Sequence, residues 1–221
     1  MIENLFTTVV GSHLWSMEHT NSDMDLFRVY VASTKDILKG TANLRSTFAQ
    51  ENNVDIHRHE VGKVINELLK GNLNFLIGVM STKVNACYAF EEITRDELCG
   101  YAVEMPFYDL QNIVKENISK NCYHSIHGLA VHNYKKYIES NLDNTEHRRA
   151  KILRVLSFGT TLLYTGKFEF APKTGKGGAE VITRWINGLD EAYKSSTLPE
   201  KPNEEPYREW LYDIRVMNLR I

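Results

Sequence analysis

Stretches of β-branched and apolar residues, separated by short polar segments, characterise the first part of the chain. Residues 6–10 and 25–31 have this composition and predict two strands, with Gly11–Ser12 and a short polar segment between them. Residues 53–59 alternate apolar and polar side chains, which is the period of a strand with one buried face. The pattern therefore predicts three strands in this part of the chain.

Helical spacing of apolar side chains dominates the remainder. Residues 60–70 carry apolar side chains three and four positions apart, and Gly71 provides a C-terminal stop. The same spacing predicts further helices over residues 107–121, 125–140, 146–164, 179–194 and 207–219. Because strands and helices mix first and helices follow, we expect an α+β fold with a boundary near Met105–Pro106. A catalytic domain would occupy residues 1–105, and a helical domain with a C-terminal extension would occupy residues 106–221.

The composition is that of an ordinary globular protein. The 221 residues include 43% hydrophobic and 24% charged side chains, and the formal net charge is -2. A nucleic-acid partner would therefore have to bind on a local basic patch. No apolar run approaches the roughly 20 residues that cross a bilayer, and the N-terminus lacks the features of a signal peptide. The three cysteines are scattered. We expect a cytoplasmic protein without a membrane partner.

Two carboxylates stand at the start of the second predicted strand. Asp23 and Asp25 are two residues apart, so their side chains share one face of the strand. Carboxylates this close repel one another unless a hard divalent cation binds them through oxygen. On the third predicted strand, Val54 and Ile56 mark the buried face and leave Asp55 on the other face. We therefore predict that Asp23, Asp25 and Asp55 are the catalytic residues and bind magnesium, or manganese in its place.

The segment after the first predicted strand favours phosphate binding. Gly11 lets the backbone approach a phosphate closely, and the Ser12 hydroxyl and nearby N–H groups can donate to it. Ser22, directly before the carboxylates, is a further candidate nucleotide-binding residue. A lone Asp-x-Asp pair is weak evidence, since solvated acidic pairs are common. The whole combination is far more specific and favours a nucleotidyltransferase, in which three carboxylates hold two metal ions for in-line attack on a nucleoside triphosphate.

The same residues carry a resemblance to a known family. Gly11-Ser12-His13-Leu14-Trp15-Ser16, a short gap and Ser22-Asp23-Met24-Asp25-Leu26 resemble the motifs Gly-Ser-x-x-Tyr-Gly and Ser-Asp-x-Asp-Leu. These motifs belong to predicted nucleotidyltransferases of the DNA polymerase β superfamily, in the group sometimes found beside RNA ligases. Lys70-Gly71-Asn72-Leu73-Asn74 is similar to a second motif of this group, and residues 151–166 are similar to its arginine-containing helix. The resemblance covers about residues 5–170.

This resemblance implies a polymerase-β-type fold, a mixed sheet with helices followed by a mostly helical C-terminal region. It implies metal-dependent transfer of a nucleoside monophosphate from a nucleoside triphosphate, ATP among the candidates, to a hydroxyl with release of pyrophosphate. An RNA end is the favoured acceptor, which indicates RNA repair. Lys151 and Arg154 would contact the triphosphate. The chain departs from the motifs where the family has Tyr, Gly and Pro, at Trp15, Ser16 and Leu73.

Several alternatives stay open at the level of the sequence. A protein side chain or a small molecule is an alternative acceptor, and a non-catalytic, antitoxin-like nucleotide-binding module is an alternative function. His57 and His59 could bind a transition metal or a phosphate, or lie on a polar strand edge. Lys173–Gly178 lacks the ending of a P-loop and is rejected as one, and a mobile basic loop that contacts RNA stays an open alternative. Packing of a terminal helix, rather than base stacking, is the favoured interpretation of three aromatic residues, Tyr207, Trp210 and Tyr212.

Overall fold

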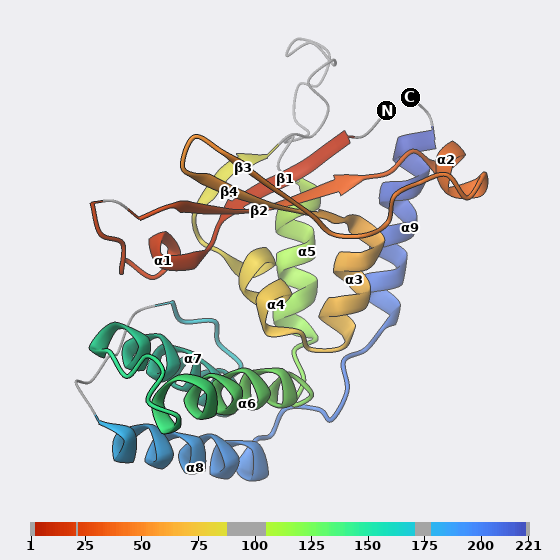
Figure 1. Ribbon diagram of the computed structural model, residues 1–221. Helices are drawn as coiled ribbons and strands as arrows, with labels where there is room; N and C mark the ends of the chain where they lie inside the picture. Colours follow the sequence, from red (N-terminus) through yellow and green to blue (C-terminus); the bar gives the residue numbers. More distant parts are fainter. Residues whose placement is uncertain (1–2, 21, 88–104, 171–177, 220–221) are drawn as a thin grey trace. The chain divides into compact units, whose positions relative to one another are not determined.

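The N-terminal part of the chain forms a mixed β-sheet. The computed structural model describes residues 3–20, 22–87, 105–170 and 178–219. In these ranges five strands hydrogen-bond in the order β3-β4-β2-β1-β5 (Figure 1). They are β1 (Glu3–Val9), β2 (Met24–Val31), β3 (Thr47–Glu51), β4 (Val54–Glu60) and β5 (Val84–Cys87). Strands β2 and β4 run parallel and the other neighbours antiparallel, so the predicted α+β class and mixed sheet are confirmed.

The three strands predicted from the apolar pattern correspond to β1, β2 and β4, with small shifts at their ends. The pattern predicts neither β3 nor β5. Strand β3 is an edge strand in which only Ala49 is partly covered, so its sequence lacks the alternation of a half-buried strand. Its position nevertheless matters, because it extends the sheet directly beside β4.

Helices cover one side of this sheet. Figure 1 shows α3 (Val61–Leu69), α4 (Leu73–Met80), α5 (Met105–Glu116) and α9 (Glu205–Leu219) along the same side of the strands. The rings of Phe6 on β1 and Phe107 on α5 lie 4.8 Å apart between centroids. At Gly78 on α4, a Cβ would lie 2.5 Å from the ring of Phe27, so only glycine lets this helix approach the sheet so closely. Two short helices, α1 (Gly11–Leu14) and α2 (Thr34–Leu38), follow β1 and β2.

The terminal helix α9 packs through its aromatic residues. Tyr207 and Trp210 are buried, and the indole N–H of Trp210 donates to the carbonyl of Pro106 at 3.1 Å. Tyr212 is exposed. The packing interpretation of this helix is thus confirmed for the first two aromatic residues, and base stacking by them is excluded by their burial.

The other described helices are α6 (Cys122–Asn133), the π-helix η1 (Tyr134–Glu139), α7 (Glu146–Thr165) and α8 (Ala179–Ser195). The single helix predicted over residues 125–140 is therefore α6 followed by η1. Helix α7 begins where the Thr145 hydroxyl accepts from the Arg148 backbone N–H at 3.2 Å and ends at Gly166, whose φ is 68°. The predicted helix over residues 146–164 is confirmed with both of its ends.

The chain forms two compact units that alternate along the sequence. The first comprises Met1–Leu69, Asn74–Asn117 and Asn203–Ile221, and the second comprises Lys70–Leu73 and Ile118–Pro202. The division into a catalytic domain and a helical domain near Met105–Pro106 stays a prediction. Of the segment Lys173–Gly178, for which a basic loop stays an open alternative, all but Gly178 lies outside the described residues. Among the described helices, none has the length and apolar character that crossing a bilayer requires.

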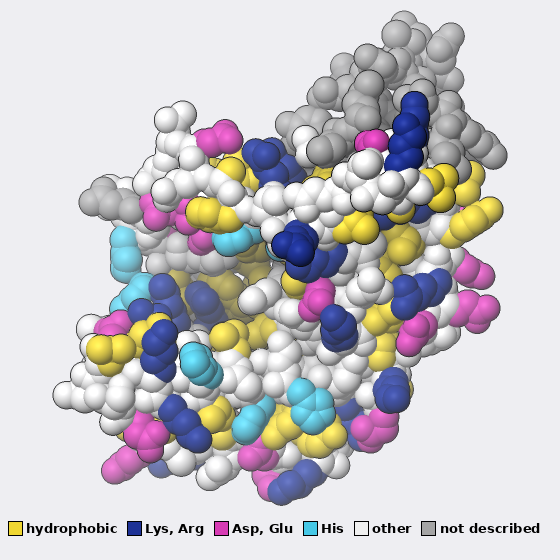
Figure 2. All heavy atoms as spheres, turned by 45° about the vertical axis from the view of Figure 1, so that its right-hand side comes forward, with side chains coloured by type: hydrophobic (Ala, Val, Ile, Leu, Met, Phe, Trp, Pro, Cys, Tyr) yellow, Lys and Arg dark blue, Asp and Glu magenta, His cyan; other side chains and the backbone are white. Residues whose placement is uncertain are grey.

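Charges of both signs are interspersed over the described residues. On the face drawn in Figure 2, dark blue Lys and Arg side chains alternate with magenta Asp and Glu side chains. This distribution agrees with the formal net charge of -2. Binding of a polyanion would therefore depend on local features of the surface.

Candidate active site

Two parallel strands bring two of the predicted carboxylates together. Strands β2 and β4 are in register, with Asp25 directly opposite Asp55. Residues opposite one another on neighbouring strands, which stand about 4.8 Å apart, point to the same face of a sheet. Asp23 lies immediately before β2 and is exposed. The choice of Asp55 as a ligand depended on the second and third predicted strands being neighbours, and the register meets this condition.

Asp25 lies in surroundings that disfavour its charge. Partial burial raises the pKa of Asp25, the negative charge of Asp55 adds to this rise, and Asp23 adds a smaller part. His57 and His13 oppose the rise. The three predicted carboxylates are therefore close enough to act on one another electrostatically. A positive charge placed among them would relieve this repulsion.

The chemistry of these donors fits a magnesium ion, which prefers carboxylate oxygens. Within the described ranges, however, no group of three or more His, Cys, Asp or Glu side chains already has the arrangement of a metal centre. Binding a cation would therefore require the three side chains to converge. Asp23 is exposed and precedes the strand, so it is the most free to turn toward Asp25. The metal ligands stay a prediction.

Gly11 is required for the close approach of the chain to Asp25. Its φ is 61°, and a Cβ at this position would lie 1.8 Å from Oδ2 of Asp25. The Val10 N–H donates to the carbonyl oxygen of Asp25 at 2.8 Å and ties the end of β1 to the start of β2. The close approach expected at Gly11 is thus made to a carboxylate. A contact with phosphate stays a prediction.

The two predicted nucleotide-binding serines of this unit both precede the carboxylates in the sequence. Ser12 is in α1, and its carbonyl oxygen accepts from the Met17 N–H at 3.0 Å. Ser22 closes a turn with His19, because its hydroxyl accepts from the His19 N–H at 2.8 Å and its own N–H donates back at 2.9 Å. Ser22 therefore has a local structural role in the turn that leads into Asp23. Its contact with nucleotide stays a prediction.

Gln50 is a residue of the site that sequence reasoning missed. It lies on β3 opposite Asp55, and its Nε2 donates to Oδ1 of Asp55 at 2.9 Å. This hydrogen bond fixes the direction of the carboxylate without neutralising it. The only signal available in the sequence was a polar side chain in an unrecognised edge strand.

The acidic residue nearest to Asp55 along the strand has another partner. Glu60 is buried, and its Oε1 lies 2.5 Å from a guanidinium nitrogen of Arg215 on α9. Its Oε2 accepts from the Gly62 N–H at 2.8 Å. Glu60 is thus engaged in holding β4, α3 and α9 together. Asp55 is therefore the carboxylate of β4 that lies opposite Asp25 without such an ion pair.

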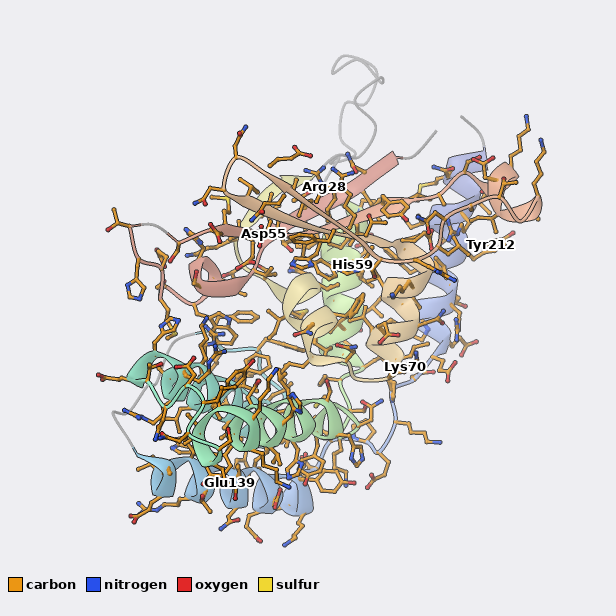
Figure 3. The ribbon with its side chains drawn as sticks, in the orientation of Figure 1. Arg28, Asp55, His59, Lys70, Glu139 and Tyr212 are labelled. Atoms are coloured by element: carbon orange, nitrogen blue, oxygen red, sulfur yellow. The ribbon has the colours of Figure 1, made fainter. Side chains whose placement is uncertain are left out.

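The two histidines of β4 have different surroundings. His57 is exposed. The ring of His59 lies 4.6 Å from that of Phe27 and 4.7 Å from that of Phe75, measured between centroids. Burial, with smaller contributions from His57 and Lys63, lowers the pKa of His59 to about 4, so it is neutral at physiological pH. His59 is therefore a packing residue. In Figure 3 it lies on the side of the sheet that the helices cover, and Arg28 lies on the opposite side.

The remaining predicted nucleotide-binding residues, Lys151 and Arg154, lie on α7 in the second unit. Burial lowers the pKa of Arg154 to about 10, which still leaves the guanidinium charged at neutral pH. A charge kept in such surroundings is suited to an anionic ligand. Triphosphate contact by Lys151 and Arg154 stays a prediction.

Comparisons with known proteins bear on this assignment. A solved nucleotidyltransferase-like protein from Exiguobacterium sibiricum is similar with 10% identity and a TM-score of 0.32, over 96% of this chain and 73% of that chain. Among curated proteins there is no significant match. A family of nucleotidyltransferases matches residues 2–168, so the protein is a nucleotidyltransferase. That family is the RNA repair pathway DNA polymerase beta family, and the chain belongs to it.

The structure also explains one departure from the family motif. Ser16 stands where the motif has glycine, and its φ is 53°, in the left-handed region that favours glycine. Trp15, at the position of the motif's tyrosine, is buried. The family motif therefore has glycine at this position because the backbone turn after α1 requires a left-handed residue. The serine leaves the turn in place at a cost in stability.

We predict that Ser16→Gly stabilises the protein. A residue with a side chain in the left-handed conformation lowers the stability by about 1–2 kcal/mol. Glycine removes this cost, but its greater freedom in the unfolded chain offsets roughly 0.5–1 kcal/mol of the gain. The free energy of unfolding should rise by about 0.5–1 kcal/mol, measured by urea denaturation. Ser16→Ala is the matched control, because it removes the hydroxyl and keeps the Cβ, and it should give no gain. An equal gain from both variants would contradict the explanation.

Proposed function

We propose that this nucleotidyltransferase moves a nucleoside monophosphate from a nucleoside triphosphate to a hydroxyl at an RNA end and releases pyrophosphate. We further propose that the reaction requires magnesium and takes place in the cytoplasm. The observation that carries the proposal is the in-register pairing of Asp25 and Asp55, with Gly11 against the Asp25 carboxylate. The RNA repair family supports RNA as the acceptor.

Each residue of the site has a role in this proposal. Asp23, Asp25 and Asp55 would hold magnesium, which when bound supplies positive charge that offsets the negative charge of the triphosphate and of the departing pyrophosphate. The triphosphate would lie against the Gly11–Ser12 segment, where the chain approaches Asp25. Asp55 lies on the strand farther from Gly11 and would orient the acceptor hydroxyl.

The transfer is a single displacement at phosphorus. The acceptor oxygen forms a bond to the α-phosphorus while the bond from that phosphorus to the oxygen of the β-phosphate breaks. Pyrophosphate leaves with the electron pair, and Asp55 accepts the proton of the acceptor hydroxyl. Gln50, through its hydrogen bond to Oδ1, leaves Oδ2 of Asp55 to face the acceptor. Gln50 is therefore a positioning residue.

Transfer of label tests the proposal directly. The protein is incubated with magnesium and each nucleoside triphosphate labelled at the α-phosphate, in the presence of single-stranded RNA and of a protein mixture. We expect label on RNA, at a mass increase of one nucleoside monophosphate. Label on protein, on a small molecule, or on nothing would contradict the proposed acceptor, and the last result would also contradict catalysis.

We predict that Ser12→Ala and Arg154→Ala each weaken triphosphate binding. Loss of one charge-assisted contact should cost on the order of 1.5–3 kcal/mol. Titration calorimetry with magnesium and a non-hydrolysable triphosphate measures this change, and thermal unfolding checks the fold. Arg148→Ala is the matched control on α7, because the Arg148 guanidinium already pairs with Asp143 at 2.9 Å. Unchanged affinity in both test variants would show that the phosphates bind elsewhere.

A further inference from the structure

An exposed aromatic pair lies beside the predicted catalytic carboxylate Asp55. Phe48 on β3 is 57% exposed. It pairs opposite His57 on β4, and the two rings are tilted at 49° with their centroids 5.1 Å apart. Strand alternation puts His57 on the face of Asp55, two residues earlier. Phe48 is on this same face, as is Gln50, which hydrogen-bonds to Asp55.

Among the described residues, the rings of this pair are exposed and contact one another. His59, two residues further along β4, is partly buried and its ring packs against those of Phe27 and Phe75. Phe48 and His57 are both exposed, and the neighbouring residue of β3 on the same face, Gln50, is polar. An exposed aromatic surface costs free energy in water, and a flat aromatic ligand that covers it recovers that free energy.

The order of the strands decides which substrate the pair faces. Across the sheet the order is β3-β4-β2-β1, and Gly11 follows β1. The carboxylates of Asp25 and Asp55 therefore lie between Gly11 on one side and Phe48 on the other. This step rests on the proposed function, in which the triphosphate lies on the side of Gly11. The substrate on the side of Phe48 is then the acceptor.

We infer that Phe48 and His57 form a stacking surface for the terminal nucleobase of a single-stranded nucleic-acid acceptor, with RNA as the acceptor proposed here. Stacking on an aromatic ring is tolerant of base identity, because every base has a π-face. It would hold the terminal sugar near Asp55, where the acceptor hydroxyl must lose its proton. Lys63 on α3, the helix that follows β4, lies close enough to His59 to affect its pKa and supplies a cation for the backbone phosphates.

A cycle of enzyme and acceptor variants tests this inference. The Michaelis constants for triphosphate and for RNA are measured with wild type, Phe48→Ala and Phe48→Trp. The RNA carries either a normal or an abasic 3′-terminal nucleotide. Phe48→Ala should raise the Michaelis constant for normal RNA roughly tenfold, since removal of one base–aromatic stack has an effect of this order. The abasic end should cause a similar rise with wild type and no further rise with Phe48→Ala. Phe48→Trp should keep the wild-type values, and so should Tyr212→Ala, the control at an exposed aromatic residue of α9.

Three results would overturn the inference while leaving transfer itself intact. They are equal use of abasic and normal ends by wild type, a rise in the Michaelis constant for triphosphate instead of RNA, and transfer of label to protein rather than to RNA.

A binding measurement separates this inference from the proposed function. Single-stranded RNA ending in 2-aminopurine is titrated with protein in the absence of triphosphate, and its fluorescence should fall on stacking. Quenching with wild type that is lost with Phe48→Ala supports the stacking surface even if no transfer occurs, in which case only the proposed function fails. Absence of quenching with wild type overturns the inference, whatever the transfer assay shows.

Discussion

Asp25→Asn is expected to abolish nucleotidyl transfer without loss of the fold. The Asp25 carboxylate lies directly opposite Asp55 and against Gly11, at the point where the proposed magnesium and the triphosphate meet. Asparagine keeps the shape of the side chain and removes its charge. The rate of transfer should fall by at least about a thousandfold, because the charge that holds the metal supplies most of the electrostatic stabilisation. Asp23→Asn should have an effect of the same kind.

The stability of this variant provides an independent check. Because the pKa of Asp25 is raised in the folded state, the folded protein holds this proton to higher pH than the unfolded chain. The free energy of unfolding therefore falls as the pH rises from the ordinary value of 3.8 through the raised folded value. In Asp25→Asn the side chain has no charge at any pH, so the free energy of unfolding does not fall in this way. The variant should therefore unfold at a higher temperature than wild type at neutral pH without magnesium. Magnesium should then stabilise wild type more than the variant.

Asp213→Asn is the matched control for these measurements. Asp213 is an exposed carboxylate on α9, so its loss should change neither transfer nor the response to magnesium. Near wild-type turnover of Asp25→Asn would contradict the metal assignment. A thermal stability unchanged from wild type would contradict the carboxylate repulsion.

Asp55→Ala is expected to separate binding from transfer. Asp23 and Asp25 remain, so the variant should still bind magnesium and triphosphate. Without Asp55 no carboxylate on β4 is left to orient the acceptor hydroxyl and take its proton, because Glu60 is engaged with Arg215. The rate of transfer should fall by about a hundred- to ten-thousandfold, the usual effect of removing a general base. Titration calorimetry and a transfer assay on the same protein measure the two properties.

Two neighbouring variants make this prediction sharper. Gln50→Ala removes only the hydrogen bond that holds Asp55, so it should lower the turnover number less and leave triphosphate affinity unchanged. Glu51 is also on β3, but it pairs with Arg58 on the other face of the sheet, so Glu51→Ala should change neither the turnover number nor the triphosphate affinity. Full transfer by Asp55→Ala, or loss of triphosphate binding in it, would rule out the role assigned to Asp55.

That Asp55 shares a face with Asp25 could be predicted, because alternation is a local pattern. The prediction that the Val54 and Ile56 side is the buried face was incomplete, because His59, on the face of Asp55, packs against Phe27 and Phe75. Asp23 and Asp25 open a strand whose following residues are apolar, and the alternation around Asp55 marks its face. Which strands are neighbours cannot be obtained from such patterns, since pairing of β2 with β4 joins residues far apart in the sequence. The choice of Asp55 rested on alternation alone and assumed that the second and third predicted strands are neighbours, and the structure supplied the register.

The elements that were missed lack the periodicity of a half-buried element. Strand β3 is an exposed edge, so its residues need no apolar face, and Gln50 and Phe48 could not be placed. Helix α4 is apolar on nearly every side, because it packs closely on the sheet at Gly78, and a helical period is hidden in such a segment. The π-helix η1 continues the apolar spacing of α6, so the sequence predicts one helix there.

The most direct test of the carboxylate site on β2 and β4 is pyrophosphate release coupled to a change in RNA mass. Wild type and Asp25→Asn are incubated with single-stranded RNA and each nucleoside triphosphate, with magnesium or with a chelator. For wild type with magnesium we predict one pyrophosphate for each nucleoside monophosphate added to RNA. We predict neither product with the chelator or with Asp25→Asn. Equal amounts of both products from wild type and Asp25→Asn would contradict the site, and pyrophosphate release without any addition to RNA would contradict the acceptor.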